Sequence, residues 1–227
     1  MSDPQDQRAT RREYQDNRLS VDDLERDPLA QFTLWLQAAI ADGAIDATAM
    51  ALSTAAIVAN PDQDQPQAIP SVRIVLLKHF DADGFCWYTD YRSQKGVELS
   101  RNPIASGLFY WREFDRQVRI TGAVEKLSSA ESETYFHERP LDSRYAAAAS
   151  TQSAVIADRT TLESRFAQLE IDFPDGNVPR PQAWGGYRLR PREYEFWQGR
   201  EGRLHDRFRF TRPTADAGSW QVERLQP

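Results

Sequence analysis

A predicted turn between two strands near the C-terminus constrains this chain more than any other stretch. Two aromatic-rich segments flank residues 199–202, where two glycines are typical of a turn. From residue 203 onward the side chains alternate strictly between two types, as they do along a β-strand. The alternation predicts that Leu204, Asp206, Phe208 and Phe210 share one face and that four basic residues share the other: Arg203, His205, Arg207 and Arg209.

This basic face has two interpretations, and the pattern alone leaves both open. The planar guanidinium of arginine donates to two phosphate oxygens at once, so several basic side chains on one face could hold an anion. Basic residues on an exposed edge strand also discourage aggregation, without any ligand.

Composition excludes several classes of protein. Of the 227 residues, 40% are hydrophobic and 27% are charged, which is typical of a globular protein. The formal net charge of −6 argues against nucleic-acid binding, so local arginine clusters favour a small anionic ligand. The single cysteine, Cys86, excludes an internal disulfide and a multi-thiolate metal site, and the histidines have no metal-binding spacing. We therefore expect no metal.

Hydropathy and composition predict the cellular location of the protein and its division into domains. No apolar run approaches the length of a membrane span, and the first ten residues are polar rather than the start of a signal peptide. We expect a cytoplasmic protein without a membrane partner. Residues 1–18 are polar and predict a flexible segment, whereas residues 19–227 show no linker and no repeat, which predicts a single domain.

The order of the predicted elements favours an α+β fold. Asp27 and Pro28 predict the start of a helix that ends near residue 42. A short helix follows Ser93, three helices lie between residue 128 and about residue 170, and the final strands begin at residues 184 and 221. No GxGxxG or P-loop motif occurs. An antiparallel sheet that curls into a small barrel is predicted from five strands, at 50–58, 71–80, 85–89, 104–111 and 117–127.

Several side chains could bind a ligand, and each has an ordinary structural alternative. Lys78 lies in an otherwise apolar predicted strand, where burial of its charge would require an anionic ligand or an internal acid. Trp197 could stack on a ligand ring or belong to the core. His205 could be a base or a hydrogen-bond donor, and neighbouring arginines would lower its pKa. The sequence thus predicts a site for a phosphorylated, planar ligand whose edges meet neutral donors: Gln117, Gln152 and Ser153.

A series of motifs then narrows the choice of ligand. The most specific is RLHDRF at residues 203–208, which follows EFWQG at 195–199. RIVLLK at 73–78, YFH at 135–137 and WGG at 184–186 precede them in order. In these motifs the chain resembles the pyridoxamine 5′-phosphate oxidase family. The resemblance implies an α+β, FMN-binding split β-barrel with flanking helices, and a homodimer that holds FMN in the cleft between its subunits.

The resemblance also implies roles for individual residues. FMN would be held by Arg73, Ile74, Val75, Leu76, Leu77, Lys78, Tyr88, Thr89, Lys95, Gln117, Gln152, Ser153, Trp197 and Arg207. The substrate would be bound by Arg11, Tyr14, Lys78, Tyr135, Arg139, Ser143, Arg203, Leu204 and His205. Of these, Arg203 and His205 would be catalytic, and Arg11 and Tyr14 would make the N-terminal segment a lid over the substrate.

The implied reaction oxidises pyridoxamine 5′-phosphate or pyridoxine 5′-phosphate to pyridoxal 5′-phosphate. A hydride would pass from C4′ of the substrate to N5 of FMN, and O₂ would take the electrons and leave as H₂O₂. Arg203 would fix the pyridine ring, while His205 would orient the substrate or accept a proton from it. One departure concerns FMN. The family usually has arginine where this chain has Gln94, and Arg92, two residues earlier, could substitute for it.

Rival functions make different predictions. An FMN split barrel that acts on another substrate should lack the substrate-binding residues as a group, whereas this chain has all of them. A protein that only stores pyridoxal 5′-phosphate would bind the ester without flavin absorbance and without peroxide release. A nucleic-acid-binding barrel conflicts with the acidic charge balance.

Overall fold

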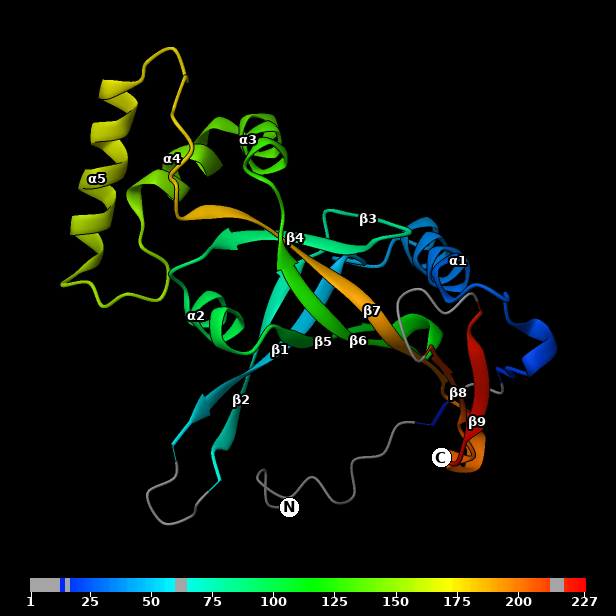
Figure 1. Ribbon diagram of the computed structural model, residues 1–227. Helices are drawn as coiled ribbons and strands as arrows, with labels where there is room; N and C mark the ends of the chain where they lie inside the picture. The colour runs from blue at the N-terminus through cyan, green and yellow to red at the C-terminus, as the bar shows by residue number, and fades with distance from the viewer. Residues whose placement is uncertain (1–12, 15–16, 60–64, 213–218) are drawn as a thin grey trace, which may run out of the picture. The chain divides into compact units, whose positions relative to one another are not determined.

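The computed structural model describes residues 13–14, 17–59, 65–212 and 219–227 (Figure 1). Within them, none of the helices is both long and apolar enough to cross a membrane. The helices of this part of the chain are α1 (Pro28–Ala41), α2 (Gln94–Arg101), α3 (Ser129–Glu138), α4 (Leu141–Ala149) and α5 (Arg159–Asp172), with 3-10 turns η1 (Val21–Asp23), η2 (Arg112–Phe114) and η3 (Glu201–Arg203). Its strands are β1 (Ala49–Val58), β2 (Gln67–Leu76), β3 (His79–Asp81), β4 (Gly84–Asp90), β5 (Ile104–Trp111), β6 (Arg116–Lys126), β7 (Trp184–Gln198), β8 (Asp206–Thr211) and β9 (Gln221–Leu225).

The strands of the described residues form one open, antiparallel sheet. Its order is β2-β1-β5-β6-β7-β4-β3, and β8 pairs with β7 and β9. The chain divides into two compact units, and β5, β6 and β7 contribute residues to both. The predicted antiparallel α+β class is confirmed, whereas a single domain over residues 19–227 stays a prediction.

Unit 2 consists of Thr48–Gly107 and Thr121–Arg192. In this unit β1 and β2 form a long antiparallel hairpin, in which Ala49 lies opposite Leu76. β4 pairs with β3 and with the first half of β7. Helices α3, α4 and α5 gather at one end of the unit (Figure 1), and around them lies a cluster of buried side chains: Phe136, Tyr145, Val178 and Trp184.

Polar side chains fix where the helices begin. Asp27 caps α1, Ser93 caps α2 and Ser128 caps α3, each as predicted. Each side chain accepts a backbone N–H that helix geometry leaves unpaired. α5 is capped by Asp158, whose side chain accepts from the Thr161 N–H.

Unit 1 consists of Leu108–Ile120, Glu193–Pro227 and the described residues of Met1–Ala47. Two aromatic residues of α1 are buried in its core. The Phe32 ring lies 4.9 Å from that of Phe109, and the Trp35 ring lies 5.3 Å from that of Phe196. The core of unit 1 therefore joins three segments that are far apart in the sequence.

The strand predicted from residue 203 begins only at Asp206. Gly202 and Arg203 have φ angles of +62° and +61°, so the chain turns there instead of continuing as a strand. His205 therefore precedes β8, and Leu204 is 69% exposed rather than buried. Within β8 the predicted alternation of buried and accessible side chains is confirmed.

The strand predicted over residues 71–80 is divided in two. β2 ends at Leu76 and β3 begins at His79, so Lys78 lies in the connection between them. The Lys78 N–H donates to the Cys86 carbonyl over 2.9 Å, while the lysine side chain is exposed. The expectation of a buried Lys78 charge was wrong, because the extended chain breaks at this residue.

The turn between β3 and β4 depends on Gly84. Its φ is +141°, and a Cβ atom there would lie 2.1 Å from the Leu189 carbonyl oxygen in β7. We expect Gly84→Ala to lower the free energy of unfolding by about 1–3 kcal/mol more than Gly43→Ala does. Gly43 has a φ of +75° with open space around it, so its alanine variant has a positive φ without a close contact. Urea unfolding of both variants measures the difference, and equal losses would contradict a role for the close contact.

Candidate functional site

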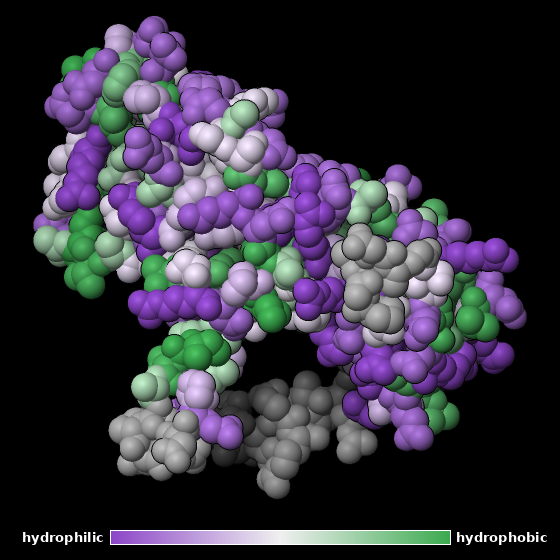
Figure 2. Space-filling model, in the orientation of Figure 1, coloured by the Kyte–Doolittle hydropathy of each residue, from purple (hydrophilic) through white to green (hydrophobic). Residues whose placement is uncertain are grey.

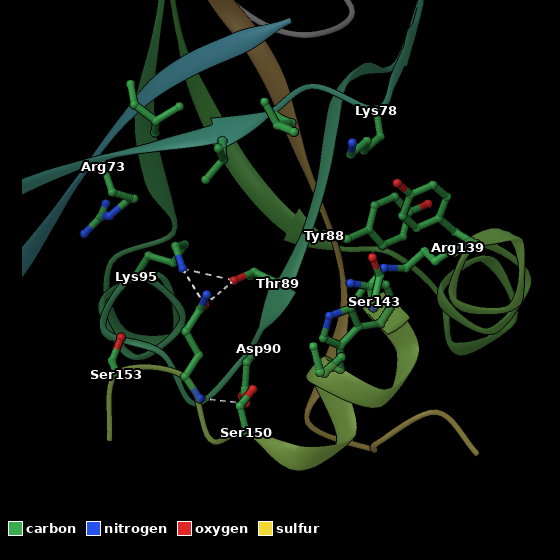
Figure 3. A pocket seen from close by; sticks show the side chains of 18 of the residues that line it. Arg73, Lys78, Tyr88, Thr89, Asp90, Lys95, Arg139, Ser143, Ser150 and Ser153 are labelled. Atoms are coloured by element: carbon green, nitrogen blue, oxygen red, sulfur yellow. Dashed lines mark hydrogen bonds between the residues drawn. The ribbon is translucent and has the colours of Figure 1, made fainter. Parts of the chain in front are cut away.

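A cavity of about 970 Å³ opens in unit 2 among β2, β4, α2, α3 and α4 (Figure 3). Leu77 is only 4% exposed and is not among its lining residues. Every other residue of unit 2 that the resemblance assigns to FMN or substrate lines this cavity: Arg73, Ile74, Val75, Leu76, Lys78, Tyr88, Thr89, Lys95, Tyr135, Arg139, Ser143, Gln152 and Ser153.

One end of the cavity contains a buried cation with neutral partners. Lys95 is 7% exposed, and its Nζ lies 3.0 Å from Thr89 Oγ1, 3.2 Å from Ser93 Oγ and 2.8 Å from Gln152 Oε1 (Figure 3). Burial, and then the nearby Arg73 charge, lower the pKa of Lys95 to about 8. A buried ammonium group surrounded by neutral oxygens fits an anionic ligand that would restore its usual pKa.

The other cation at this end, Arg73, is held by a buried acid. Its guanidinium donates to Thr54 Oγ1 and Ser71 Oγ over 2.5 Å each and to Glu98 Oε2 over 3.2 Å. Glu98 is 5% exposed and also accepts from the two hydroxyls. Arg73 is therefore held in one orientation, and most of its charge is balanced by Glu98. The sequence pattern did not single out Glu98, Thr54 or Ser71.

The position where the family usually has arginine is part of the same network. Gln94 Nε2 donates to Glu98 Oε1 over 3.0 Å. Arg92 is engaged elsewhere, since its Nε and Nη2 donate to the Asp90 carboxylate over 3.0 and 2.6 Å and Nη2 also donates to the Ser150 carbonyl. The substitution of Arg92 for the family's arginine stays a prediction, and in this structure the Asp90 carboxylate holds the Arg92 guanidinium.

Beside these polar groups, β2 presents an apolar strip to the cavity. Val72, Ile74 and Leu76 are 68%, 64% and 42% exposed, and all three line the cavity. Figure 2 shows apolar surface on the β1–β2 hairpin. Exposed apolar side chains next to a buried cation fit a ligand that has both a planar ring system and an anionic group.

The opposite end of the cavity is aromatic and cationic. The Tyr88 and Tyr135 rings stack with centroids 3.9 Å apart, and the Arg139 guanidinium lies 4.6 Å from the centre of the Trp184 ring. Arg139 Nη1 is buried and has no hydrogen-bond partner within the described residues. With Lys78 and Ser143 also lining this end, it fits a second anionic group.

In unit 1, three rings gather at the turn after β7. The Tyr14 ring lies edge-on to Trp197 and to His205, with centroids 5.7 and 4.9 Å apart, and Trp197 lies 4.6 Å from His205. The Arg200 N–H donates to His205 Nδ1 over 3.1 Å. Burial, and then Arg203, lower the pKa of His205, whereas Asp115 raises it.

Arg203 projects from an unusual backbone. It is exposed and has a φ of +61°, a conformation that costs energy in residues other than glycine and often occurs at functional sites. Ser153, in the cavity of unit 2, has a φ of +70°. Leu204 follows Arg203 and is exposed as well.

The basic residues of β8 are paired with acids. Arg207 donates to the Glu195 carboxylate over 2.9 Å and to the Gln226 carbonyl over 2.8 Å. Glu195 is 2% exposed and also pairs with Arg119. Arg209 pairs with Glu223 over 2.7 Å at the surface, so the solvated interpretation holds for this residue.

Two further residues are assigned to ligand binding by the resemblance. Gln117 is a half-buried residue of β6 in unit 1, and Arg11 lies outside the described residues. In the part of the chain that the structure describes, no group of histidine, cysteine, aspartate and glutamate residues could hold a metal ion.

Two family models match the chain. One, described as pyridoxamine 5′-phosphate oxidase, covers residues 36–171. The other, described as the pyridoxine 5′-phosphate oxidase C-terminal dimerisation region, covers residues 184–227.

Individual proteins agree with the models. The pyridoxine/pyridoxamine 5′-phosphate oxidase of Janthinobacterium sp. is 47% identical over 96% of this chain and 97% of its own length. Among solved structures, PhzG from Burkholderia lata, in complex with tetrahydrophenazine-1-carboxylic acid, is 32% identical with a TM-score of 0.81 over 93% of this chain and 99% of its own. A pyridoxamine 5′-phosphate oxidase-related, FMN-binding protein from Nostoc punctiforme shares the fold, with 17% identity and a TM-score of 0.66 over 88% of this chain and 98% of its own. The resemblance in the motifs is thus confirmed, and the chain belongs to the pyridoxamine 5′-phosphate oxidase family.

Proposed function

We propose that this chain oxidises pyridoxamine 5′-phosphate and pyridoxine 5′-phosphate to pyridoxal 5′-phosphate, with FMN as cofactor, O₂ as electron acceptor and H₂O₂ as product. Family membership supports the reaction class, the cofactor and the substrate. The observation that carries the proposal is the cavity of unit 2. It combines two cationic ends with an apolar strip, as a phosphorylated cofactor and a phosphorylated substrate require.

The donor set of the cavity fits FMN. Lys95, Arg73, Gln152 and Ser153 would hold its phosphate and polar edges, while the apolar strip of β2 would meet its ring system. When bound, FMN supplies the redox chemistry of the reaction. The chain itself supplies binding, orientation and the electrostatic environment.

The aromatic end fits the substrate. Arg139, with its unpartnered Nη1, would bind the substrate phosphate together with Lys78, Ser143 and Tyr135. Arg203 and His205 would act on the pyridine ring. Arg11 and Tyr14 would cover the bound substrate as a lid.

The chain forms a homodimer, as its dimerisation region indicates. We place FMN at the interface between subunits. Support comes from five residues assigned to ligand binding that fall within residues 184–227, the dimerisation region: Trp197, Arg203, Leu204, His205 and Arg207. A cytoplasmic location is also part of the proposal.

An absorbance spectrum of the purified protein, followed by peroxide detection, tests this function. We expect bound flavin, and stoichiometric release of H₂O₂ and pyridoxal 5′-phosphate when pyridoxine 5′-phosphate is added in air. A colourless protein that binds the ester without producing peroxide would instead indicate a storage protein.

The depressed pKa of Lys95 predicts that FMN binding depends on pH. The phosphate would raise this pKa on binding, so binding takes up a proton wherever free Lys95 is deprotonated, above a pH of about 8. We expect the dissociation constant of FMN to be flat between about pH 7 and pH 8, where the phosphate is a dianion, and to rise by up to about tenfold per pH unit above that range. Asp90 and Glu98 also act on Lys95, but both are ionised throughout this range.

Two controls isolate the lysine. Riboflavin lacks the phosphate and should show no such slope. Lys95→Arg keeps its positive charge to a higher pH, so its dissociation constant for FMN should not rise above pH 8. A slope that persists in Lys95→Arg would assign the titration to another group.

A further inference from the structure

The turn between β7 and β8 fixes the position of one ring nitrogen of His205. The Arg200 N–H donates to Nδ1 over 3.1 Å. A nitrogen that accepts this hydrogen bond carries no proton, so the neutral ring must carry its proton on Nε2. The assignment follows from the backbone donor, because a backbone amide cannot act as an acceptor.

The donor is itself held in place by several contacts. The Gly199 N–H donates to the Asp115 carbonyl over 2.7 Å, and the Gln198 side chain donates to the Phe114 carbonyl over 2.9 Å. Arg200 pairs with Asp206, which is 4% exposed. The turn that presents the Arg200 N–H is therefore anchored on both sides of the hydrogen bond.

The ring is also restrained by its neighbours. Tyr14 lies edge-on to it at 4.9 Å, and Trp197 lies at 4.6 Å. A flip of the imidazole would exchange Nδ1 for a carbon and leave the Arg200 N–H without its acceptor. The two aromatic rings and the backbone hydrogen bond thus favour one orientation and one tautomer.

We propose that His205 acts in catalysis as a neutral hydrogen-bond donor through Nε2–H and does not accept a proton from the substrate. This inference rests on the proposed function, since the group it addresses is a hydrogen-bond acceptor on the bound pyridine substrate. Nε2 already carries a proton, and Nδ1 could take one only by losing the Arg200 N–H. Of the two roles that the sequence leaves open for His205, base or donor, the geometry points to the donor.

The charged groups around His205 agree with a neutral ring. Burial and the Arg203 guanidinium lower its pKa, and the Asp115 carboxylate opposes them. Arg200 approaches through its backbone N–H, while its guanidinium is directed to Asp206. Tyr14 and Trp197 contribute rings without charge.

Nitrogen NMR of the FMN-loaded protein, labelled with ¹⁵N-histidine, observes the tautomer directly. The chain has three histidines, at residues 79, 137 and 205. The signal that is lost in His205→Gln is therefore that of His205. At pH 8 we expect a bare Nδ1 and a protonated Nε2 for His205. A protonated Nδ1 with a bare Nε2, or an imidazolium ion, would overturn the proposal.

Two substitutions test the role in the reaction. The amide NH₂ of glutamine can reach the place of Nε2, whereas asparagine ends near the place of Nδ1. We expect His205→Gln to keep at least about a tenth of kcat/KM and His205→Asn to lose about 10²-fold, with equal FMN content in both. An asparagine variant as active as the glutamine variant would contradict a donor at Nε2.

The two readouts separate this inference from the proposed function. If the wild-type protein shows the Nε2–H tautomer but does not oxidise pyridoxine 5′-phosphate, the proposed function fails while the assignment of the ring stands. If the protein oxidises the ester and His205 shows the other tautomer, only this inference fails.

Discussion

Arg203→Ala should lower kcat for pyridoxine 5′-phosphate oxidation by about 10²–10³-fold while bound FMN stays near the wild-type level. Arg203 is exposed and lies on a turn of positive φ, so its loss removes no core contact. The expected partner of its guanidinium is the substrate, whose developing charge it would stabilise. Steady-state kinetics and the flavin absorbance of the same preparation measure both quantities.

Two other arginines serve as controls for Arg203→Ala. Arg209 pairs with Glu223 at the surface, and Arg209→Ala should leave both kcat and flavin content within about twofold of wild type. Arg207→Ala should lose flavin first and retain activity per remaining flavin. Its partner Glu195 keeps Arg119 as a counter-ion in that variant, so the fold should survive. If Arg203→Ala instead lost flavin and kept its activity per flavin, the assignment of Arg203 to the substrate would be wrong.

Glu98→Ala should lower the free energy of unfolding of the FMN-free protein by about 3 kcal/mol, because it leaves Arg73 in a mostly buried site without its acid. Glu98 Oε2 receives hydrogen bonds from Thr54, Ser71 and Arg73, and Gln94 donates to Oε1. All four donors lose this carboxylate at once, although Arg73 keeps the hydroxyls of Thr54 and Ser71 as acceptors. Urea unfolding measures the loss, and an FMN titration should show weaker binding, since Arg73 is no longer held in one orientation.

Two variants make this test specific. Glu98→Gln keeps a hydrogen-bond acceptor without the charge, so its free energy of unfolding should lie between those of wild type and Glu98→Ala. Glu163→Ala breaks an exposed ion pair with Arg159 and should change stability by no more than about 0.5 kcal/mol. A loss in Glu98→Ala as small as that in Glu163→Ala would show that the network does not hold Arg73.

Glu98 also predicts an effect of pH on stability. Burial alone would raise its pKa, but hydrogen bonds from Thr54, Ser71 and Gln94, with the Arg73 charge, together lower it below 4.5. A carboxylate with a depressed pKa stabilises the folded state above its unfolded pKa, and this contribution is lost as the pH falls through the folded pKa. The stability difference between wild type and Glu98→Gln should therefore shrink below pH 4.5.

The sequence predicted local structure well because local signals determine it. Caps at Asp27, Ser93 and Ser128 predicted three helix starts, and short apolar runs bounded by turns predicted most strands. Alternation alone could not reveal the turn at Arg203, since a loop residue can continue a pattern of period two by chance. The positive φ of that residue depends on the surrounding structure.

The site was predictable in part, and only through the motifs. Residue types alone suggested a phosphorylated planar ligand, and family motifs supplied the individual residues. Neither the residue types nor the motifs predicted the Glu98 network, because its members come from β1, β2 and α2 and meet only when the strands pair. Thr54 lies directly opposite Ser71 in the β1–β2 register, and no spacing along the chain predicts that pairing.

The interleaved composition of the two units has a consequence for biosynthesis. The α1 rings of Phe32 and Trp35 need β5 and β7 to complete their core, and the ribosome makes β7 long after α1. Until β7 has been synthesised, Trp35 of α1 lacks its core partner Phe196 and stays uncovered on that side. Nascent chains stalled before residue 193 should therefore recruit chaperones through α1, and completion of β7 should end that interaction.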